Sequence, residues 1–369
     1  MKTERQTLTY LALRKFRKNL WGAFSFGVIL VFIFIAVFAY VLASDNSQNA
    51  NQMHLTIHSK PPGFEVLMLK IPLDDNQKIK FRDYFFGHNN QFTEIPLQNY
   101  RTNNDTIYYR EYSEDFADLP EKNIHLNSFI GYDSIEKVVE DCIVKQKFHL
   151  GTDKYGRDLL SRMLVGSRVS LSIGFVAVFI SLIVGVFFGA LGGYYGGKTD
   201  AFVMWLVNVI WSIPTLLLVI AITLALGKGF WQVFVAVGLT MWVEVARVVR
   251  GQIISVKQTQ FVTAARALGF SDFRIIKNHI LPNIIAPVIV ISAANFASAI
   301  LVESGLSFLG LGAQPPVPSW GGMIKDHYNY IVLGKPYLAL IPGMAIMLVT
   351  LAFMMTGNAL RDAFDVKAS

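Results

Sequence analysis

The stretch VSLSIGFVAVFISLIVGVFFGAL, residues 169–191, decides the fold class of this chain of 369 residues. It contains no charged residue, and about 20 apolar residues in a helix are enough to cross the hydrocarbon core of a bilayer. Gly185, Gly189 and Gly193 recur at intervals of four within and just after it. Because small residues at this spacing let helix backbones approach closely in lipid, the stretch predicts a membrane-spanning helix packed on a neighbour.

Five further apolar runs accompany it. They are residues 21–43, 201–227, 229–243, 284–302 and 336–360. The run at 229–243 is shorter than the others, and its helix is expected to continue to Arg250. In chain order it is the fourth of the six runs. Of the whole chain, 53% is hydrophobic and 16% is charged, whereas soluble proteins carry about 25% charged residues. The sequence therefore predicts an all-α polytopic membrane protein with six transmembrane helices.

Basic residues indicate the orientation, because cytoplasmic loops of membrane proteins carry an excess of Lys and Arg. Before the first run, opposed only by Glu4, they are Lys2, Arg5, Arg14, Lys15, Arg17 and Lys18. Within residues 247–282, opposed only by Asp272, they are Arg247, Arg250, Lys257, Arg266, Arg274 and Lys277. Both segments are expected in the cytoplasm, and six spans then place both termini there. The first run is too long for a signal-peptide core of about 7–15 residues, so no cleavable signal is expected.

Residues 44–147 differ in character from the rest, being polar and richer in acidic than in basic residues. Alternation of apolar and polar residues at 54–58 and 65–70 predicts short strands, so a small β-containing extracytoplasmic insertion is expected. His54 and His58 are interpreted either as metal ligands or as solvated side chains, and the strand pattern favours the second. Cys142 is the only cysteine, which excludes an internal disulfide and a cysteine-based metal cluster.

The predicted organisation follows from these segments. It consists of a cytoplasmic N-terminus at 1–20, a first transmembrane helix at 21–43, the insertion at 44–147, and a core at 148–369 that holds five transmembrane helices and a cytoplasmic loop at 251–283.

The cytoplasmic loop contains QFVTAARALGFSDFRIIKNHILPN, residues 260–283, which predicts two short helices. Gly269 is a natural residue for the end of the first helix, Ser271 or Asp272 can cap the second, and Pro282 ends it. One face of the first helix is predicted to hold Phe261, Ala264, Ala265 and Leu268, and one face of the second Phe273, Ile276 and Ile280. The small alanines leave room for another protein, so the pattern indicates a docking element.

This loop resembles the E-A-A-x-x-x-G-x₉-I-x-L-P motif of permease subunits in ATP-binding-cassette importers. Ala264, Ala265, Gly269 and Pro282 stand at motif positions, with Ile280 and Leu281 before the proline, whereas Thr263 replaces the usual Glu. The resemblance implies a coupling helix seated in a groove of an ATPase subunit. The coupling residues that it implies are Thr263, Ala264, Ala265, Arg266, Leu268, Gly269 and Pro282.

Three further segments resemble the dipeptide/oligopeptide permease family, and specifically its second permease subunit. They are GTDKYGRDLLSR at 151–162, LSFLGLG at 306–312 with PSWG at 318–321, and LRDAFD at 360–365. The resemblance covers the first span and residues from about 148 onward, but not most of 46–147.

The resemblance implies a permease subunit that forms the path for peptides or similar small solutes in a bacterial inner membrane. Implied partners are a homologous permease, two ATP-binding-cassette ATPases, an extracytoplasmic solute-binding protein and the lipid bilayer, without nucleic acid. Nickel chelates, glutathione and sugar-like compounds remain alternative solutes. A receptor, an exporter component and a membrane-embedded enzyme are the alternatives to an importer.

No catalytic constellation and no cofactor of its own are expected in this chain, and ATP is expected to bind to partner subunits. Residues 192–199, GGYYGGKT, match the phosphate-binding pattern G-x-x-x-x-G-K-[ST]. A real loop of this kind follows a strand and precedes a helix. Here it joins two apolar runs, so a tight turn between helices is expected instead.

Several polar and special residues near the spans are candidates for function. The candidate translocation path comprises Pro214, which is expected to kink its span, Asn295 and Glu303. Glu244, placed near the inner end of the fourth span, is either a functional charge within the membrane or a member of an i, i+3 ion pair with Arg247 at the membrane edge, and the ion pair is preferred. In the 151–162 segment, an Asp158–Arg162 pair at i, i+4 and a structural role at the outer membrane edge are preferred over substrate contact.

Overall fold

The computed structural model describes residues 8–73, 80–113, 119–227 and 229–364. Lys2, Glu4, Arg5 and Asp365, which entered the sequence interpretation, lie outside these ranges. The chain divides into two compact units. The helical unit comprises Met1–Ile33, Ser170–Gln314 and Met344–Ser369, and the sheet unit comprises Phe34–Val169 and Pro315–Gly343.

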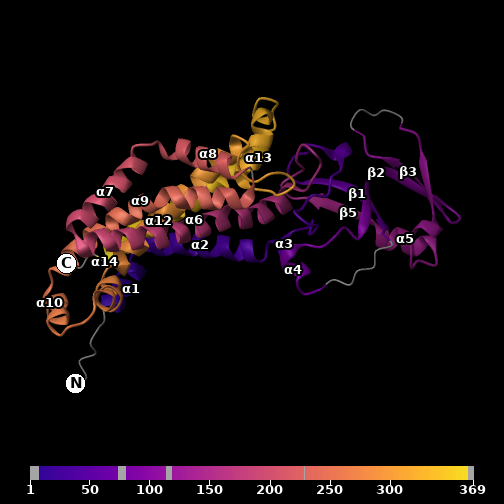
Figure 1. Ribbon diagram of the computed structural model, residues 1–369. Coiled ribbons are helices and arrows are strands. Elements are labelled where there is room, and N and C mark those ends of the chain that lie inside the picture. Colours follow the sequence, from indigo (N-terminus) through magenta and orange to yellow (C-terminus); the bar gives the residue numbers. More distant parts are fainter. Residues whose placement is uncertain (1–7, 74–79, 114–118, 228, 365–369) are drawn as a thin grey trace, which may run out of the picture. The chain divides into compact units, whose positions relative to one another are not determined.

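Helices build the helical unit, and most of them are apolar (Figure 1). In chain order they are α1 (Leu8–Lys18), α2 (Leu20–Val37), α6 (Leu159–Tyr195), α7 (Gly197–Trp211), α8 (Thr215–Leu226), α9 (Phe230–Lys257), α12 (Ile285–Phe308) and α14 (Tyr337–Phe364). Within the described residues, α2, α6, α9, α12 and α14 are each long and apolar enough to cross a membrane. The helices α7 and α8 pass the same test only as a pair, and they are bent by 89° at the break between them. They make a sixth span if the bent pair is taken as one.

Pro214 lies at this break, as the sequence predicts. It occupies the position before the first residue of α8, with φ of −53° and ψ of 125°. Proline lacks the N–H that a continuous helix needs, and it disfavours helical backbone at the preceding residue. The change of direction is therefore a full break between two helices and not the mild kink expected from the sequence.

The contact between α6 and α9 depends on the three glycines spaced four apart. A Cβ atom on Gly185 would come within 2.5 Å of the Cβ of Val245, and one on Gly189 within 2.7 Å of the carbonyl oxygen of Ala246. These distances are far below van der Waals contact, so only glycine allows the two backbones to lie this close. The predicted packing of this span on a neighbouring helix is confirmed.

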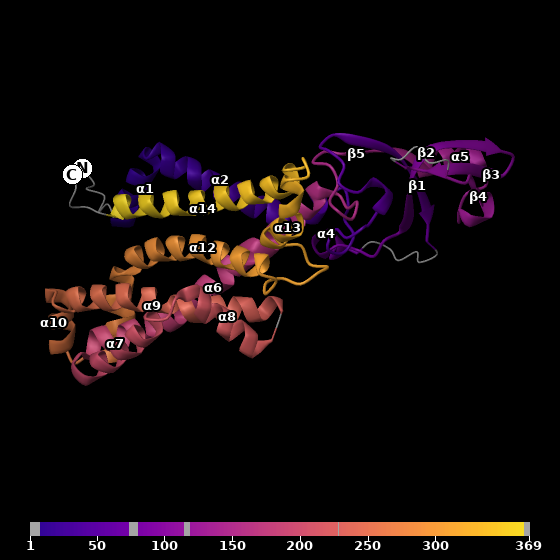
Figure 2. The same ribbon diagram turned by 90° about the horizontal axis from the view of Figure 1, so that it is seen from above.

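The N-terminal helices lie against α14, and Figure 2 shows α2 running alongside it. Ala12 and Phe16 of α1 pack on Ala359 and Ala363. Residues 192–195 end α6 and residues 197–199 begin α7, so the turn between the two helices lies at Gly196 and Gly197, which have φ of 70° and 52°. Because helices flank it on both sides, the expectation of a turn in place of a nucleotide loop is confirmed.

The sheet unit contains an antiparallel sheet in the order β4-β3-β2-β1-β5 (Figure 1). Its strands are β1 (Phe64–Pro72), β2 (Phe92–Asn103), β3 (Thr106–Glu111), β4 (Lys122–His125) and β5 (Ile143–Phe148). Short helices and turns of this unit are α3 (Ala39–Leu42), η1 (Leu55–Ile57), α4 (Asp83–Phe86), η2 (Leu126–Ser128), α5 (Ile135–Cys142), α13 (Trp320–His327) and η5 (Tyr328–Ile331). The prediction of a β-containing insertion is confirmed.

One face of the sheet is covered by α5, whose Val138 and Cys142 pack with Leu69, Leu97 and Ile107. Cys142 is a free, buried thiol.

The predicted strand at 65–70 lies within β1, whereas the one predicted at 54–58 is wrong. That segment forms the 3₁₀ turn η1, which brings Ile57 into a second cluster with Val66, Met68 and Phe148. A turn can take the place of the strand here, because Ile57 is the only apolar side chain of this segment that has to be buried.

The interpretation of both histidines as solvated is correct for His58 and wrong for His54. His54 is buried, and its Nε2 lies 3.4 Å from a carboxylate oxygen of Glu94, whose other oxygen lies 3.0 Å from Nζ of Lys70. Burial raises the pKa of Glu94, but the hydrogen bonds and charges of His54 and Lys70 outweigh it and hold that pKa below its usual value. The described residues contain no group of three or more metal-ligating side chains.

The close approach of α6 and α9 leads to a stability prediction. Gly189→Ala should destabilise the purified chain in detergent by about 1–3 kcal/mol, because the added methyl group overpacks the interface. A matched control is Gly251→Ala in α9, where a Cβ meets nothing within 4 Å; this change should be neutral or stabilising by about 0.5–1 kcal/mol. The measurement is the thermal unfolding midpoint of both variants, and equal midpoints would contradict the packing argument.

Candidate coupling loop and membrane cavities

The loop that the sequence predicts to be cytoplasmic contains α10 (Gln260–Ala267), the first of its two predicted helices. Gly269, with φ of 76°, ends it. The N–H of Gly269 donates to the carbonyl of Arg266 at 3.0 Å, and the N–H of Phe270 donates to that of Ala265 at 3.2 Å. These two bonds form a Schellman motif, which satisfies the last carbonyl groups of the helix and requires a residue with positive φ.

The predicted face of α10 is divided between two sides of the helix. Val262 and Ala265 are buried against Val249 and Ile253 of α9, whereas Phe261, Ala264 and Leu268 are exposed. The grouping of Ala265 with the outward residues is therefore wrong. A helix of eight residues needs its own inward contacts to stay attached to α9, and the small Ala265 provides one of them.

The second predicted helix is irregular. It comprises α11 (Asp272–Ile275), a π-helical turn η3 (Ile276–Ile280) and a 3₁₀ turn η4 (Leu281–Asn283) that contains Pro282. Ser271 has the extended backbone of a cap residue, but its side chain makes no capping hydrogen bond. Ile275 and Ile280 are buried, whereas Phe273 is exposed, so the prediction that Phe273 shares one face with Ile280 is wrong. The π turn between them changes the rotation per residue, so these two residues do not align as they would in a regular α-helix.

The loop presents an exposed apolar surface flanked by cations. We define the loop surface as Phe261, Leu268 and Phe273, whose exposed fractions are 43%, 72% and 73%. Its neighbours include the exposed Arg266, Arg274 and Lys277. Arg274 lies 4.3 Å from the centre of the Phe270 ring, and Lys277 lies 5.8 Å from that of Phe273.

The loop carries a net positive charge that its single carboxylate cannot offset at the surface. Asp272 is the only acidic residue in 251–283, and its Oδ1 accepts a hydrogen bond from the hydroxyl of Tyr194 at 2.6 Å. Thr263, in place of the usual Glu, is exposed, and its hydroxyl donates to the Thr259 carbonyl at 3.3 Å. The loop surface is therefore suited to an apolar groove with acidic residues around it.

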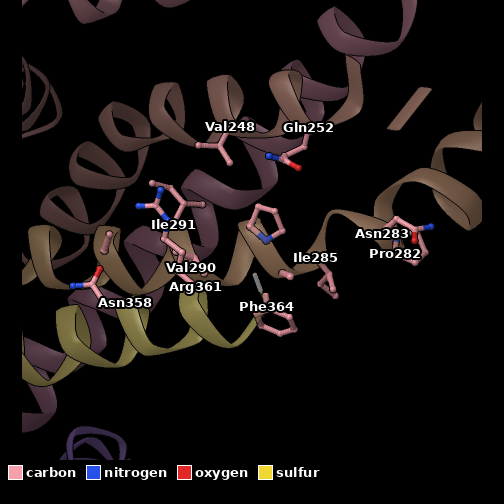
Figure 3. Close-up of a pocket in the computed structure, with 13 residues that line it drawn as sticks. Val248, Gln252, Pro282, Asn283, Ile285, Val290, Ile291, Asn358, Arg361 and Phe364 are labelled. Atoms are coloured by element: carbon pink, nitrogen blue, oxygen red, sulfur yellow. The ribbon is translucent and has the colours of Figure 1, made fainter. Parts of the chain in front are cut away.

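A cavity of about 960 Å³ lies beside the loop. Figure 3 shows its walls, with Val248 and Gln252 on α9, Pro282 and Asn283 on η4, and Arg361 on α14. The other lining residues are Ile285, Ala286, Pro287, Val290, Ile291, Ala294, Asn358 and Phe364. Pro282, a predicted coupling residue, therefore forms part of a wall shared by the loop and the spanning helices.

The three predicted path residues are not brought together. Pro214 is exposed at the α7–α8 break, whereas Asn295 and Glu303 are buried on α12. Glu303 accepts a hydrogen bond from the Ser307 hydroxyl at 2.6 Å. None of the three lines the 960 Å³ cavity.

A smaller cavity of about 190 Å³ lies where the α7–α8 break meets α9 and α12. Its polar lining residues are Thr215, Thr240, Glu244 and Ser298. Sequence patterns do not identify this group, because its members lie on three helices; only the charge of Glu244 within an apolar run was a signal.

The predicted Glu244–Arg247 ion pair is wrong. Nη2 of Arg247 donates to the Asn208 amide oxygen at 2.8 Å, and the guanidinium lies 3.3 Å from the centre of the Trp211 ring. No salt bridge to Glu244 is present among the described residues. Glu244 lies about 20 Å from either end of α9, at 1.5 Å per residue, so the helix extends well beyond the predicted end of the fourth span.

The segment 151–162 forms a buried charged network in the sheet unit. Asp153 accepts hydrogen bonds from Nε of Arg157 at 2.6 Å and from two backbone N–H groups. Its carboxylate also lies 3.7 Å from Arg162. Asp158 instead accepts from the hydroxyls of Ser44 and Ser161, at 2.9 and 2.5 Å. The predicted Asp158–Arg162 pair is therefore wrong, since Arg162 turns to Asp153.

This network ties the start of the insertion to the 151–162 segment. Arg157 donates to the side chain of Asn51 at 2.9 Å, and the Thr152 hydroxyl donates to the Ile57 carbonyl at 2.5 Å. The buried Trp320 of the PSWG segment donates to the Met163 carbonyl at 3.1 Å. These bonds hold the segment to the start of the insertion and to the PSWG segment, as a structural role requires.

The comparison with known families decides the assignment. Residues 181–368, about half of the chain and including the loop at 251–283, match the binding-protein-dependent transport system inner membrane component family. The chain belongs to this family. Residues 7–62 also match the N-terminal transmembrane domain of oligopeptide transport permease C. The protein is thus a membrane-spanning permease subunit of a binding-protein-dependent transporter, and the resemblance inferred from its motifs is confirmed.

Individual relatives agree with the family. The permease is 42% identical over 217 residues to the dipeptide transport system permease protein DppC of Alkalihalophilus pseudofirmus, covering 59% of this chain and 71% of that protein. It is 39% identical over 218 residues to the glutathione transport system permease protein GsiD of Pectobacterium atrosepticum, covering 59% and 72%. Among solved structures, it is similar to a chain of the inward-facing MetNI methionine ABC transporter, with a TM-score of 0.46 and 18% identity over 55% of this chain and 95% of that one.

The buried network of the 151–162 segment leads to a second prediction. Asp153→Asn leaves Arg157 and Arg162 buried without their carboxylate, which should cost about 3–5 kcal/mol and expose residues 44–60 to proteolysis. A matched control is Asp326→Asn, which removes the 3.1 Å pair between partly exposed Lys154 and Asp326 and should cost under about 1 kcal/mol. Unfolding midpoints and cleavage rates are the measurements, and equal effects of the two changes would contradict the structural role.

Proposed function

We propose that this chain is one of two permease subunits of an ATP-driven importer for peptides or similar small solutes. In this proposal it lies in a bacterial inner membrane with both termini in the cytoplasm. It pairs with a homologous permease and contacts two ATP-binding-cassette ATPases, which bind the ATP, while an extracytoplasmic binding protein delivers the solute. The family assignment supports the transport role, and the names of the peptide and glutathione relatives support the class of solute.

The observation that carries the coupling part of the proposal is the exposed loop surface. Phe261, Leu268 and Phe273 are large apolar side chains on a short helix pair whose inward side is packed on α9. Contiguous exposed apolar groups outside the membrane indicate a protein contact. The Lys and Arg bias around the loop supports a cytoplasmic location, where the ATPases would bind.

The attachment of the loop supports its role in coupling. Val262, Ala265, Ile275 and Ile280 share one buried cluster with residues of α6 and α9. A displacement of the loop by an ATPase would therefore act directly on those two spans. The remaining predicted coupling residues, Thr263, Ala264, Arg266, Gly269 and Pro282, lie on or beside this surface.

The docking role is tested by co-purification from native membranes. The double variant Leu268→Glu with Phe273→Glu should lose the ATPases, because burial of each side chain is worth about 1.5–3 kcal/mol, and their joint loss should weaken binding at least about 100-fold. Both side chains are exposed, so the fold should tolerate the changes. The measurement is the amount of ATPase and of second permease retained on the tagged chain.

The matched control is Val332→Glu with Leu333→Glu, which changes two exposed apolar residues of the sheet unit, at 91% and 67% exposure. The control should retain the ATPases. If neither the wild type nor any variant ever retains an ATPase, the importer assignment is rejected, and a membrane receptor becomes the leading alternative.

The insertion is proposed to shape the docking surface for the binding protein. The two ends of its sheet are adjacent, because the N–H of Gly63 donates to the Phe148 carbonyl at 2.9 Å, so a short linker can replace the sheet. Replacing residues 64–147 by two glycines should abolish most uptake while the ATPases and second permease still co-purify. Normal uptake by this variant would reject the docking role.

A further inference from the structure

Glu244 lies about halfway along α9, a helix long and apolar enough to span a membrane, and its side chain is exposed on this chain. A charged side chain within a membrane is costly, and such residues face a protein interior or a water-filled cavity and mark substrate or ion pathways. The two basic side chains nearest to Glu244 along α9 are engaged elsewhere. Arg247 bonds to Asn208 and covers Trp211, while Nη2 of Arg250 lies 2.6 Å from Asp200 on α7.

The cavity of about 190 Å³ that Glu244 lines is formed by three parts of the helical unit. The α7–α8 break contributes Trp211 and Thr215, α9 contributes Thr240 and Glu244, and α12 contributes Ser298. Its apolar lining residues are Ile210, Ile213, Leu218, Met241, Val243 and Val302. The lining thus combines one negative charge, three hydroxyl groups and apolar walls.

We propose that Glu244, with the hydroxyl groups of Thr215, Thr240 and Ser298, binds an ammonium group of the transported solute midway through the membrane. This inference rests on the proposed importer function and specifies the chemical class of its substrate. It selects solutes that carry a cationic amine, either at a peptide N-terminus or on a lysine side chain.

The hydrogen-bonding capacity of the lining matches this ligand. An ammonium group presents three N–H donors and no acceptor. The Thr240 hydroxyl already donates its proton to the Val237 carbonyl at 2.9 Å, so its oxygen is left only to accept. A carboxylate is likewise acceptor-only. An anion in this cavity would be repelled by the carboxylate of Glu244, and no lining residue is cationic. The lining therefore disfavours anions.

The volume and the apolar walls are consistent with a group in passage. A cavity of this size holds an amine and a few carbon atoms, but not a whole tripeptide. One carboxylate with hydroxyl groups also binds weakly enough to release the ligand, which a transport path requires. The site is therefore expected to affect which solutes pass and how fast they pass, and not to bind the solute tightly.

The experiment uses the complete importer reconstituted in proteoliposomes with its binding protein. Two pairs of peptides are compared, at concentrations of Ala-Lys-Ala and Ala-norleucine-Ala that saturate the binding protein. The first pair is Ala-Lys-Ala and Ala-norleucine-Ala. The second pair is Ala-norleucine-Ala and its N-acetylated form. The first pair tests a side-chain amine and the second a terminal amine. Wild type should favour the amine-bearing member of at least one pair.

Glu244→Gln, which keeps the shape and removes the charge, should reduce that preference roughly tenfold, the effect of one hydrogen bond to a charged group. Glu244→Asp should retain most of the preference, and Ser298→Ala should lower it in the same direction by less. Co-purification of the ATPases and the stimulated ATP hydrolysis rate show that each variant is assembled.

The outcomes separate the two levels of the proposal. If wild type and Glu244→Gln show the same preferences while both transport peptides, the amine site is rejected and the importer function stands. An equal loss of all peptides in the assembled Glu244→Gln complex also rejects it, in favour of a contact with another subunit. If wild type transports no peptide, the proposed solute class and the amine site are both rejected.

Discussion

The close contact between α6 and α9 is the constraint on which the rest of the helical unit depends. Gly185, Gly189 and Gly193 remove the side chains that would keep the two backbones apart, and α9 presents Val245, Val249 and Ile253 to them. This contact fixes α9 in place. The C-terminal part of α9 then holds the loop through Val262 and Ala265, and its middle carries Glu244 to the cavity at the α7–α8 break. One packed pair of helices thus connects the exposed loop surface to the carboxylate of Glu244.

The parts of this arrangement that depend on local sequence were predictable. Uninterrupted apolar runs located the spans, glycine spacing located the α6–α9 contact, and Gly269 located the end of α10, because each feature acts on its own stretch of backbone. Partners distant in sequence were not predictable in the same way. Helix periodicity suggested Arg247 for Glu244 and Arg162 for Asp158, whereas the real partners include Asn208 for Arg247 and Asp153 for Arg162. A long basic side chain reaches several neighbours, and only the fold determines which one it meets.

The sheet unit shows why the 151–162 segment is charged yet buried. Asp153, Arg157 and Arg162 lie within a few residues of one another and are almost completely shielded from water. Their hydrogen bonds reach residues 49–51, at the beginning of the insertion, as well as their own backbone. Such a network is costly to bury, but the protein loses much stability if any member of it is removed. The network therefore fixes one conformation of the chain where residues 49–51 meet the 151–162 segment. The sheet itself can then vary without disturbing that conformation.

The π-helical turn at Ile276–Ile280 has a consequence for how such loops diversify. A π turn is an α-helix that has gained one residue, and one residue of α-helix corresponds to a rotation of about 100°. Deleting or adding a single codon in this turn would therefore rotate α11, and with it the exposed Phe273, about the helix axis, while Val262 and Ala265 still hold α10 on α9. The position of Phe273 relative to Phe261 and Leu268 is thus set by the phase of one turn, and a change in the shape of the loop surface can begin with a change of chain length by one.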